Sequence, residues 1–165
     1  MITIREFRPP DVRQMVELFY DTVHTINARD YSKAQLEAWA PKAEQEARAR
    51  QWLSSFRDRF AYVAECGGDI VGFGDMTTEG YLDRLYLHKD YQGQGVASAL
   101  VAALERDAGS AGIRMAHTDA SLTARPFFEK QGYAVIRTQS VERKGVMLTN
   151  IRMEKELQGD HARDD

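Results

Sequence analysis

The sequence predicts a single mixed α/β domain in which a mostly antiparallel sheet of about six or seven strands is flanked by helices. Three observations lead to this class. The chain has 165 residues, enough for one domain with a sizeable core, and 43% of them are hydrophobic. Segments that alternate apolar and polar residues, as strands do, are interspersed with segments that have helical spacing. Three strand-like segments also follow one another with short turns between them, which favours antiparallel pairing.

The first third of the chain predicts one strand and three helices. Residues 2–7 alternate apolar and polar side chains, as a short strand does. Apolar residues recur at three- and four-residue spacings over 12–23, which predicts a helix that begins after two prolines and an aspartate. Ser32 caps a second helix, 33–40, and Pro41 ends it. A third helix spans roughly 43–57. Its expected buried side chains are Ala47, Trp52, Leu53 and Phe56.

The rest of the domain alternates strands and helices. Strands are expected over residues 61–66, 70–77, 80–88, 114–121, 134–141 and 146–157. The Gly-Gly-Asp sequence between the first two of these is a hairpin signal. Helices are expected over 96–108 and 124–131. The domain would therefore span 1–157, and the polar tail 158–165 is expected to be disordered.

Composition and charge exclude several classes of protein. The formal net charge of −3 makes nucleic acid a poor candidate partner. No apolar run approaches the roughly 18 residues of a membrane span, and the N-terminus lacks the apolar core of a signal peptide. A lone cysteine, Cys66, cannot form an internal disulfide or a thiolate zinc cluster, and the four histidines lack metal-ligand spacing. We expect a cytoplasmic monomer or homodimer without a metal.

The segment from Tyr86 to Leu100, YLHKDYQGQGVASAL, leads from a strand through a glycine turn into a helix. Such helix N-termini bind anions. A dinucleotide-binding fingerprint is disfavoured, because Ser98 replaces its third glycine and the turn does not follow the first strand. A Walker P-loop would need Gly-Lys-Ser/Thr, which the sequence lacks. Taken by itself, the turn could also be a purely structural chain reversal.

Two motifs resemble the Gcn5-related N-acetyltransferases (GNAT), in particular the small bacterial members. Gln92-Gly93-Gln94-Gly95-Val96-Ala97 fits Q/R-x-x-G-x-G/A, the acetyl-CoA pyrophosphate loop of that family. The later segment ARPFFEKQGY, residues 124–133, is similar to its A-x-x-F-Y-x-x-x-G-F/Y helix. The resemblance covers nearly the whole chain and implies the GNAT fold, with a splayed central strand pair, and acetyl-CoA as acetyl donor.

The resemblance also implies where the coenzyme binds. Backbone N–H groups of the strand before the loop would bond the pantetheine arm, and that of Leu85 would stabilise the oxyanion of a tetrahedral intermediate formed by direct amine attack. The implied cofactor-binding residues are Leu85, Tyr86, Leu87, Gln92, Gly93, Gln94, Gly95, Val96, Ala97, Ser98, Ser121 and Phe128.

The catalytic groups depart from the family pattern. Phe128 stands where relatives carry a tyrosine that protonates the leaving sulfur, and Tyr81 stands where several carry a glutamate base. Asp83 is therefore a candidate base, with a simple salt bridge as the alternative. His117, two residues before Asp119 on one strand face, is another candidate, with a hydrogen-bonded core histidine as the alternative.

The acceptor is expected to be a small-molecule or peptide amine. The resemblance places substrate selection on the first two helices and the last two strands. The residues expected to line the acceptor pocket are His24, Tyr31, Trp39 and Asn150. Because the tyrosine at 128 is lost, a second reading stays open, namely a GNAT-fold protein that binds acyl-CoA as a sensor or structural ligand without turnover.

Overall fold

The computed structural model describes residues 1–157, so the predicted tail 158–165 lies outside the described residues. Its strands are β1 (Ile2–Glu6), β2 (Phe60–Cys66), β3 (Asp69–Met76), β4 (Tyr81–Leu87), β5 (Met115–Ser121), β6 (Ala134–Arg143) and β7 (Val146–Glu156). Its α-helices are α1 (Val12–Thr25), α2 (Lys33–Trp39), α3 (Gln45–Ser55), α4 (Val96–Ser110) and α5 (Arg125–Lys130). None of the helices in residues 1–157 is both long and apolar enough to cross a membrane.

All seven strands form one mixed sheet in the order β1-β2-β3-β4-β5-β7-β6. Neighbouring strands are antiparallel except β4 and β5, which run parallel. A parallel pair needs a crossover, and α4 supplies it. The predicted fold class, a single α/β domain with a largely antiparallel sheet, is therefore confirmed.

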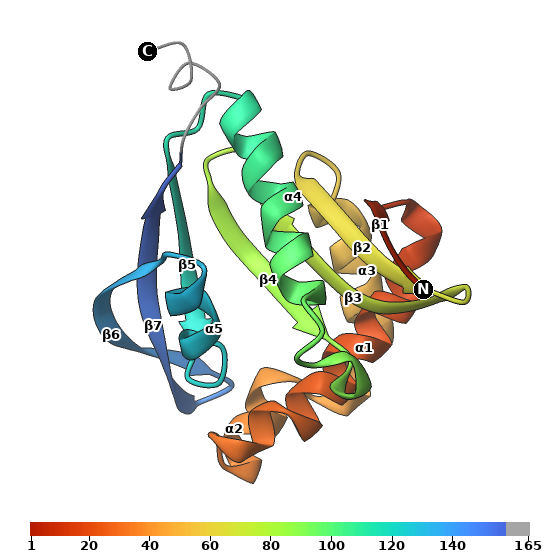
Figure 1. Cartoon of the computed structure of the whole chain (residues 1–165). Helices are drawn as coiled ribbons and strands as arrows, with labels where there is room; N and C mark the ends of the chain where they lie inside the picture. The colour runs from red at the N-terminus through yellow and green to blue at the C-terminus, as the bar shows by residue number, and fades with distance from the viewer. Residues whose placement is uncertain (158–165) are drawn as a thin grey trace.

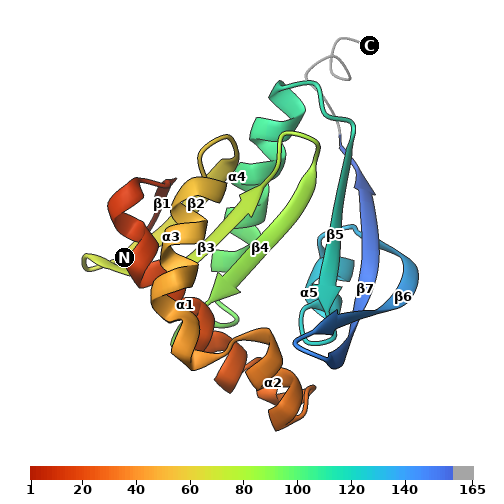
Figure 2. The same cartoon turned by 180° about the vertical axis from the view of Figure 1, so that it is seen from behind.

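Helices cover both faces of the sheet (Figures 1 and 2). The long helix α4 packs on one face, mainly against β2 and β3, and α5 lies near β5. The opposite face is covered by α1, which packs on β3 and is itself contacted by α3. Each face thus has its own core: Leu100 and Leu104 of α4 are fully buried in one, and Met15 and Val23 of α1 in the other.

The buried stripe of α3 differs from the prediction. Trp52 and Phe56 are buried as expected, four residues apart on one side of the helix. Leu53 is 43% exposed, so its predicted burial is wrong. It lies one position off the stripe, because the partly buried Ala49 continues the line of Trp52 and Phe56 by one turn.

The sheet is split at its centre, where β4 and β5 diverge (Figure 1). Within residues 1–157, the two strands pair at two positions, Tyr81 with His117 and Leu82 with Thr118. The register between β3 and β4 also shifts at this point, since Arg84 pairs with Asp75 but Leu82 with Met76. Asp83 is the extra residue of this bulge, which bends β4 away from β5. Beyond Leu82, the backbone of β4 faces a gap.

Candidate active site

The glycine turn is shaped to leave backbone groups open at the start of α4. Gly93 and Gly95 have φ values of +75° and +79°, a region that L side chains rarely adopt. A Cβ atom on either glycine would meet no protein atom within 4 Å, so the space above the turn is free. Gly95 is the N-cap of α4, and the first turn contains no acidic residue. The N–H groups of that turn have no partner within the helix and can bind an anion.

Polar side chains of the loop brace it from within. Gln92 Nε2 donates to the Leu87 carbonyl at 3.1 Å, and Gln94 Nε2 donates to the Asp90 carbonyl at 3.2 Å. Ser98 Oγ accepts a hydrogen bond from Gln131 of the segment after α5 at 2.9 Å. Of the other predicted loop residues, Val96, the first residue of α4, is buried in the core, and Ala97 lines the cavity described next. These bonds hold the loop while its backbone stays free.

The backbone of β4 offers donors toward the gap. His88 N donates to the Val71 carbonyl of β3 at 2.8 Å. Because N–H groups alternate along a strand, Tyr86 also directs its N–H toward β3, whereas Leu85 and Leu87 direct theirs to the side that β5 has left. Two of the three predicted backbone donors therefore face the gap. Tyr86 contributes its side chain instead, which lines both cavities of the site.

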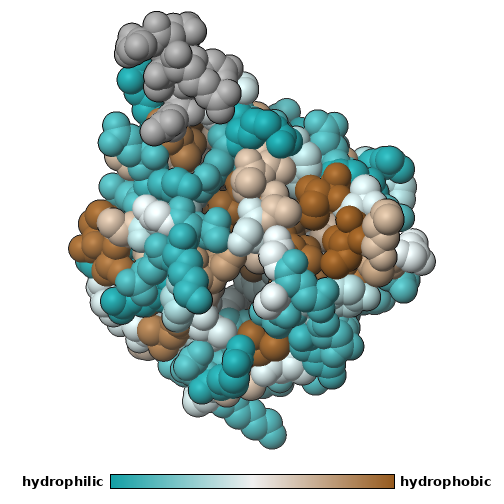
Figure 3. All heavy atoms as spheres, viewed as in Figure 1, coloured by the Kyte–Doolittle hydropathy of each residue, from teal (hydrophilic) through white to brown (hydrophobic). Residues whose placement is uncertain are grey.

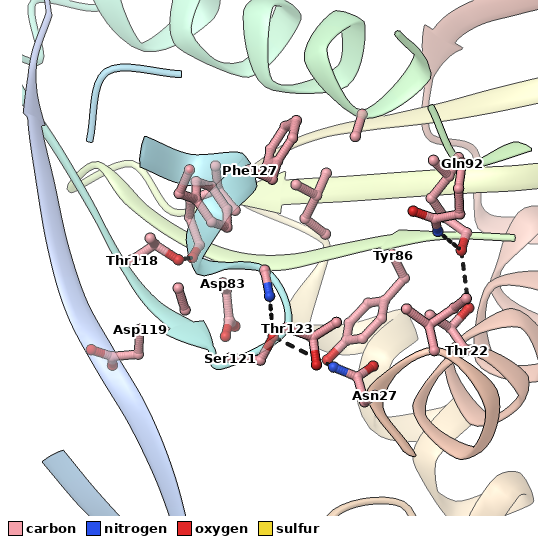
Figure 4. Close-up of a pocket in the computed structure, with 18 of the residues that line it drawn as sticks. Thr22, Asn27, Asp83, Tyr86, Gln92, Thr118, Asp119, Ser121, Thr123 and Phe127 are labelled. Atoms are coloured by element: carbon pink, nitrogen blue, oxygen red, sulfur yellow. Dashed lines mark hydrogen bonds between the residues drawn. The ribbon is translucent and has the colours of Figure 1, made fainter. Parts of the chain in front are cut away.

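A first cavity, of about 200 Å³, occupies this gap, and it is called the coenzyme cavity after the ligand that the sequence predicts there. Figure 4 shows residues of α1, β4, β5 and the segment leading into α5 around it, with Thr22 and Gln92 both bonded to the Leu87 carbonyl. In the space-filling view, the surface is hollowed between α5 and the N-terminal end of α4 (Figure 3). The gap is thus reachable from the glycine turn, since Gln92 and Ala97 line its outer end.

Phe128 and Ser121 both border the coenzyme cavity. Phe128 is only 3% exposed and packs edge-on against Phe127 and Tyr133, each with ring centroids 5.2 Å away. Ser121 Oγ accepts hydrogen bonds from the Ala124 N–H at 3.0 Å and from Asn27 Nδ2 at 3.4 Å. Ser121 therefore orders the turn into α5, and Phe128 provides an apolar wall without a proton to donate.

A second cavity, of about 400 Å³, lies on the side of α2 and the β6–β7 hairpin, and it is called the acceptor cavity after the residues that the sequence predicts for the acceptor. Three of the four predicted acceptor residues line it: Tyr31, Trp39 and Asn150. His24 does not; its Nε2 lies 2.8 Å from the Ala40 carbonyl, at the end of α2. The side chains that border both cavities are Trp39, Asp83, Tyr86, Asp119 and Ser121.

Comparison with known proteins agrees with this geometry. The sequence profile of the acetyltransferase (GNAT) domain matches residues 27–157. The chain is 33% identical over 152 residues to the uncharacterized N-acetyltransferase YafP of Escherichia coli strain K12, covering 92% of this chain and 94% of that protein. The chain belongs to the GNAT family.

Solved GNAT structures have the same architecture. A GCN5-related N-acetyltransferase from Rhodopseudomonas palustris, described as a class-II aminotransferase, is 35% identical and superimposes with a TM-score of 0.86, covering 94% of this chain and 95% of that one. The PaiA N-acetyltransferase of Thermoplasma acidophilum, solved in complex with coenzyme A, is 21% identical with a TM-score of 0.74, covering 94% and 99%.

Asp83, the first candidate base, belongs to a cluster of charges under the bulge of β4. Its Oδ2 accepts a hydrogen bond from Arg59 at 2.6 Å and lies 3.9 Å from Arg84. Both arginines also bond the buried Asp75, at 2.9 and 2.6 Å. Burial raises the pKa of Asp75 to about 6, although Arg84 pulls it down. The predicted salt-bridge alternative for Asp83 is thus present, and Asp83 still reaches both cavities.

His117 and Asp119 occupy one face of β5 but do not bond each other in the described part of the chain. His117 stacks on Tyr81 with ring centroids 5.2 Å apart and lines neither cavity. Burial, helped by the nearby Arg152, lowers its pKa. Asp119 accepts hydrogen bonds from Tyr81 at 3.1 Å and Gln139 at 2.7 Å. The histidine thus sits where β4 and β5 are still paired, before the gap opens.

Sequence reasoning missed three contributors to the site. Tyr86 is predicted only through its backbone, so the role of its side chain is missed. Arg48 of α3 is missed too, and so are the two arginines beside Asp83, Arg59 and Arg84. A weak signal existed, because arginines are uncommon on a strand face that packs on aromatic residues. Among His, Cys, Asp and Glu side chains of residues 1–157, no group of three or more is placed to hold a metal ion.

Proposed function

We propose that this chain acetylates the amine of a small molecule, with acetyl-CoA as donor, by direct attack through a tetrahedral intermediate. The observation that carries the proposal is the meeting of the two cavities. The coenzyme cavity runs from the start of α4 along the open edge of β4, and five side chains separate it from the acceptor cavity. A thioester and an amine entering from opposite sides would meet at this junction.

The residues fit acetyl-CoA in charge and in shape. The open N–H groups at Gly95 and the first turn of α4 suit a pyrophosphate, and the positive-φ glycines leave room for it. When bound, acetyl-CoA supplies the acetyl group as a thioester. The Leu85 N–H, facing the gap, is the donor positioned to stabilise charge on the acetyl oxygen.

Asp83 is the group we assign to the amine. An alkylamine is mostly protonated at neutral pH, so a nearby acceptor must orient it and take up a proton. Oδ2 of Asp83 is held by Arg59, whereas Oδ1 has no hydrogen-bond partner within residues 1–157. The oxygens of Asp119 are both engaged, by Tyr81, Gln139 and Arg152. Asp83 therefore has the free acceptor oxygen at the junction.

Tyr86 is the group we assign to the leaving sulfur in place of the missing tyrosine at 128. Tyr86 lines both cavities, whereas Tyr31 and Tyr81 line the acceptor cavity alone among the cavities described. Burial raises the pKa of its phenol, which stays protonated at neutral pH and can donate a proton. The edge-on contact with Phe19, with centroids 4.9 Å apart, holds the ring in place.

The second candidate function is acyl-CoA binding without turnover. It is favoured by Phe128, which places an apolar ring where relatives are expected to carry the proton donor. This candidate requires the same coenzyme cavity and differs in the absence of acetyl transfer.

One experiment tests the proposal in two steps. The purified protein is heated with acetyl-CoA, CoA, NAD or ATP, and a ligand at about a hundred times its Kd should stabilise it by ~2.7 kcal/mol. The protein is then incubated with acetyl-CoA and a panel of amines while free thiol is measured. A shift with the two coenzymes and amine-dependent thiol release support the acetyltransferase. A shift without release from any amine supports the binding protein, and no shift rejects both.

A further inference from the structure

The acceptor cavity has an uneven distribution of charge. Its two carboxylates have cationic partners, since Asp83 bonds Arg59 and Asp119 bonds Arg152. Arg48 also lines the cavity, yet within residues 1–157 no carboxylate lies within 4.0 Å of its guanidinium. An arginine that borders a cavity without an acidic partner is a candidate for binding an anion.

Arg48 is held in one orientation by aromatic neighbours. Its Nε donates to the Tyr20 hydroxyl at 2.9 Å. Its guanidinium carbon lies 5.1 Å from the ring centroid of Phe19 and 5.6 Å from that of Tyr20. Within residues 1–157 the hydrogen bond uses Nε, and neither terminal amino group of Arg48 has a hydrogen-bond partner. Both are therefore available for the fork-like pairing that arginine makes with a carboxylate.

A second cation lies on the hairpin that closes this end of the cavity. Lys144, at the tip between β6 and β7, forms an ion pair with Glu44 just before α3. Arg48 follows Glu44 by about one helical turn, and Arg143 precedes Lys144 in the chain. The ion pair thus joins the two segments that carry Arg48 and Arg143, and both arginines line the cavity.

Nearer the junction, the cavity offers an acceptor atom. Asn150 Oδ1 is buried and has no hydrogen-bond partner within the described residues. Asn150 pairs across the sheet with Ser121, which borders both cavities. A buried polar atom without a partner is costly, so this oxygen suits the N–H of a bound molecule. The walls between the two ends are aromatic, with Phe19, Trp39 and Trp52 among them.

We infer that the acceptor is a small amine that also carries an acidic group, an amino acid or a compound of that type. Arg48 binds the acidic group with help from Arg143, the aromatic walls contact an apolar body, and the amine lies toward Asn150 and Asp83. The inference rests on the proposed function, because it names the substrate class for the same site. It adds that recognition depends on the acid as well as on the amine.

Matched pairs of ligands test the inference without requiring turnover. The CoA-loaded protein is titrated by calorimetry with α-, β- and γ-amino acids that have apolar side chains and with their primary amides, which keep the amine and remove the negative charge. We expect the tightest-binding acids to bind about ten to a hundred times more tightly than their amides, the range of one charged hydrogen-bonded pair. Thiol release with acetyl-CoA is measured on the same panel.

Two variants separate recognition from a merely structural effect. Arg48→Met keeps an unbranched side chain against Phe19 and removes the charge, so the preference for acid over amide should fall close to one. Arg50→Met, at an exposed position of the same helix, should retain the preference. A structural defect would weaken acid and amide binding alike and leave their ratio unchanged, so the ratio is the deciding quantity.

The outcomes distinguish the class of ligand from turnover. Equal binding of acids and amides, no binding of any compound on the panel, or the same preference in both variants would overturn the inference. Acetylation of amides with no preference for acids would leave the acetyltransferase standing and remove the acid-binding role of Arg48. Acids that bind tightly through Arg48 but are never acetylated would support the inference about the ligand and contradict turnover.

Discussion

The two cavities of the site are built in different ways. The proposed coenzyme site relies on backbone groups: the N–H groups at the start of α4 and along β4, made available by two glycines and a bulge. The acceptor cavity is lined by side chains that come from α1, α2, α3, β4, β5 and the β6–β7 hairpin. Backbone donors do not depend on which side chains the sequence carries, whereas side chains can change one at a time. One fold can in this way keep its donor and vary its acceptor.

The largest effect is expected at the proposed coenzyme site, for Gly95→Glu. At φ +79° a side chain is strained, and a carboxylate would stand where the pyrophosphate approaches. We expect the affinity for CoA to fall by more than about a hundredfold, measured by calorimetry. Gly112→Glu is the matched control. Gly112 follows the C-terminal end of the same helix, and like Gly95 it has a positive φ, +87°, and no protein atom where a Cβ would stand. Equal CoA affinity in the two variants would show that the loop assignment is wrong.

The side chains that line the acceptor cavity are tested first at Asp83. Asp83→Asn should lower acetyl transfer by about a hundredfold, the lower range for loss of a positioned base, and leave CoA affinity unchanged. Thiol release at saturating acetyl-CoA measures the rate, and calorimetry measures the affinity. Asp58→Asn, at an exposed position, is the control. If Asp119→Asn loses the rate and Asp83→Asn keeps it, the base has been assigned to the wrong strand.

Tyr86 lines both cavities, and removing its hydroxyl tests whether it protonates the leaving sulfur. Tyr86→Phe should reduce turnover about tenfold, because a thiol of pKa ~8.5 can still leave as a thiolate without a proton donor. Adding Phe128→Tyr to that variant should restore part of the loss, since Phe128 borders the same cavity. Unchanged turnover in Tyr86→Phe would indicate that solvent protonates the sulfur.

Features that depend on local sequence could be predicted, whereas features that depend on contacts between distant residues could not. The order of strands and helices, the glycine loop and the position of Phe128 follow from short local patterns, and the structure confirms the predicted fold. The acceptor side depends on contacts between residues far apart in the chain, such as Tyr31 donating to the Thr149 carbonyl at 2.6 Å. Periodicity does not encode such pairs. The sequence therefore gives no sign of the role of Arg48, and His24, predicted for the acceptor pocket, does not line it.

The bulge of β4 shows a second limit. The sequence YLDRLYL alternates well enough to predict a strand, but the extra residue is visible only in the pairing of Asp75 with Arg84 and Met76 with Leu82. The bulge interrupts the regular alternation of β4 at Asp83, directly after the last position at which β4 pairs with β5. The charged cluster under it, with Arg59 and Arg84 on Asp75, fixes this geometry from the side of α3.

The last prediction concerns stability and the anchor of α1, the helix whose Phe19 lines the acceptor cavity. Asp11 accepts two hydrogen bonds from Arg5, both at 2.9 Å, and one from the Arg8 N–H at 2.8 Å. Burial alone would raise its pKa, but these donors hold it below the ordinary value of 3.8. The folded state therefore binds a proton less readily than the unfolded state, and the stabilisation is present above about pH 4 and lost as the pH falls below it.

Asp11→Asn should accordingly lower the free energy of unfolding by about 2 kcal/mol at pH 7, measured by urea denaturation. The difference from the native chain should shrink as the pH is lowered from 4 toward 2. Asp21→Asn, exposed on the same helix, serves as the control and should change stability little. A loss of equal size at pH 7 and pH 3 would mean that Asp11 acts through packing and not through its charge.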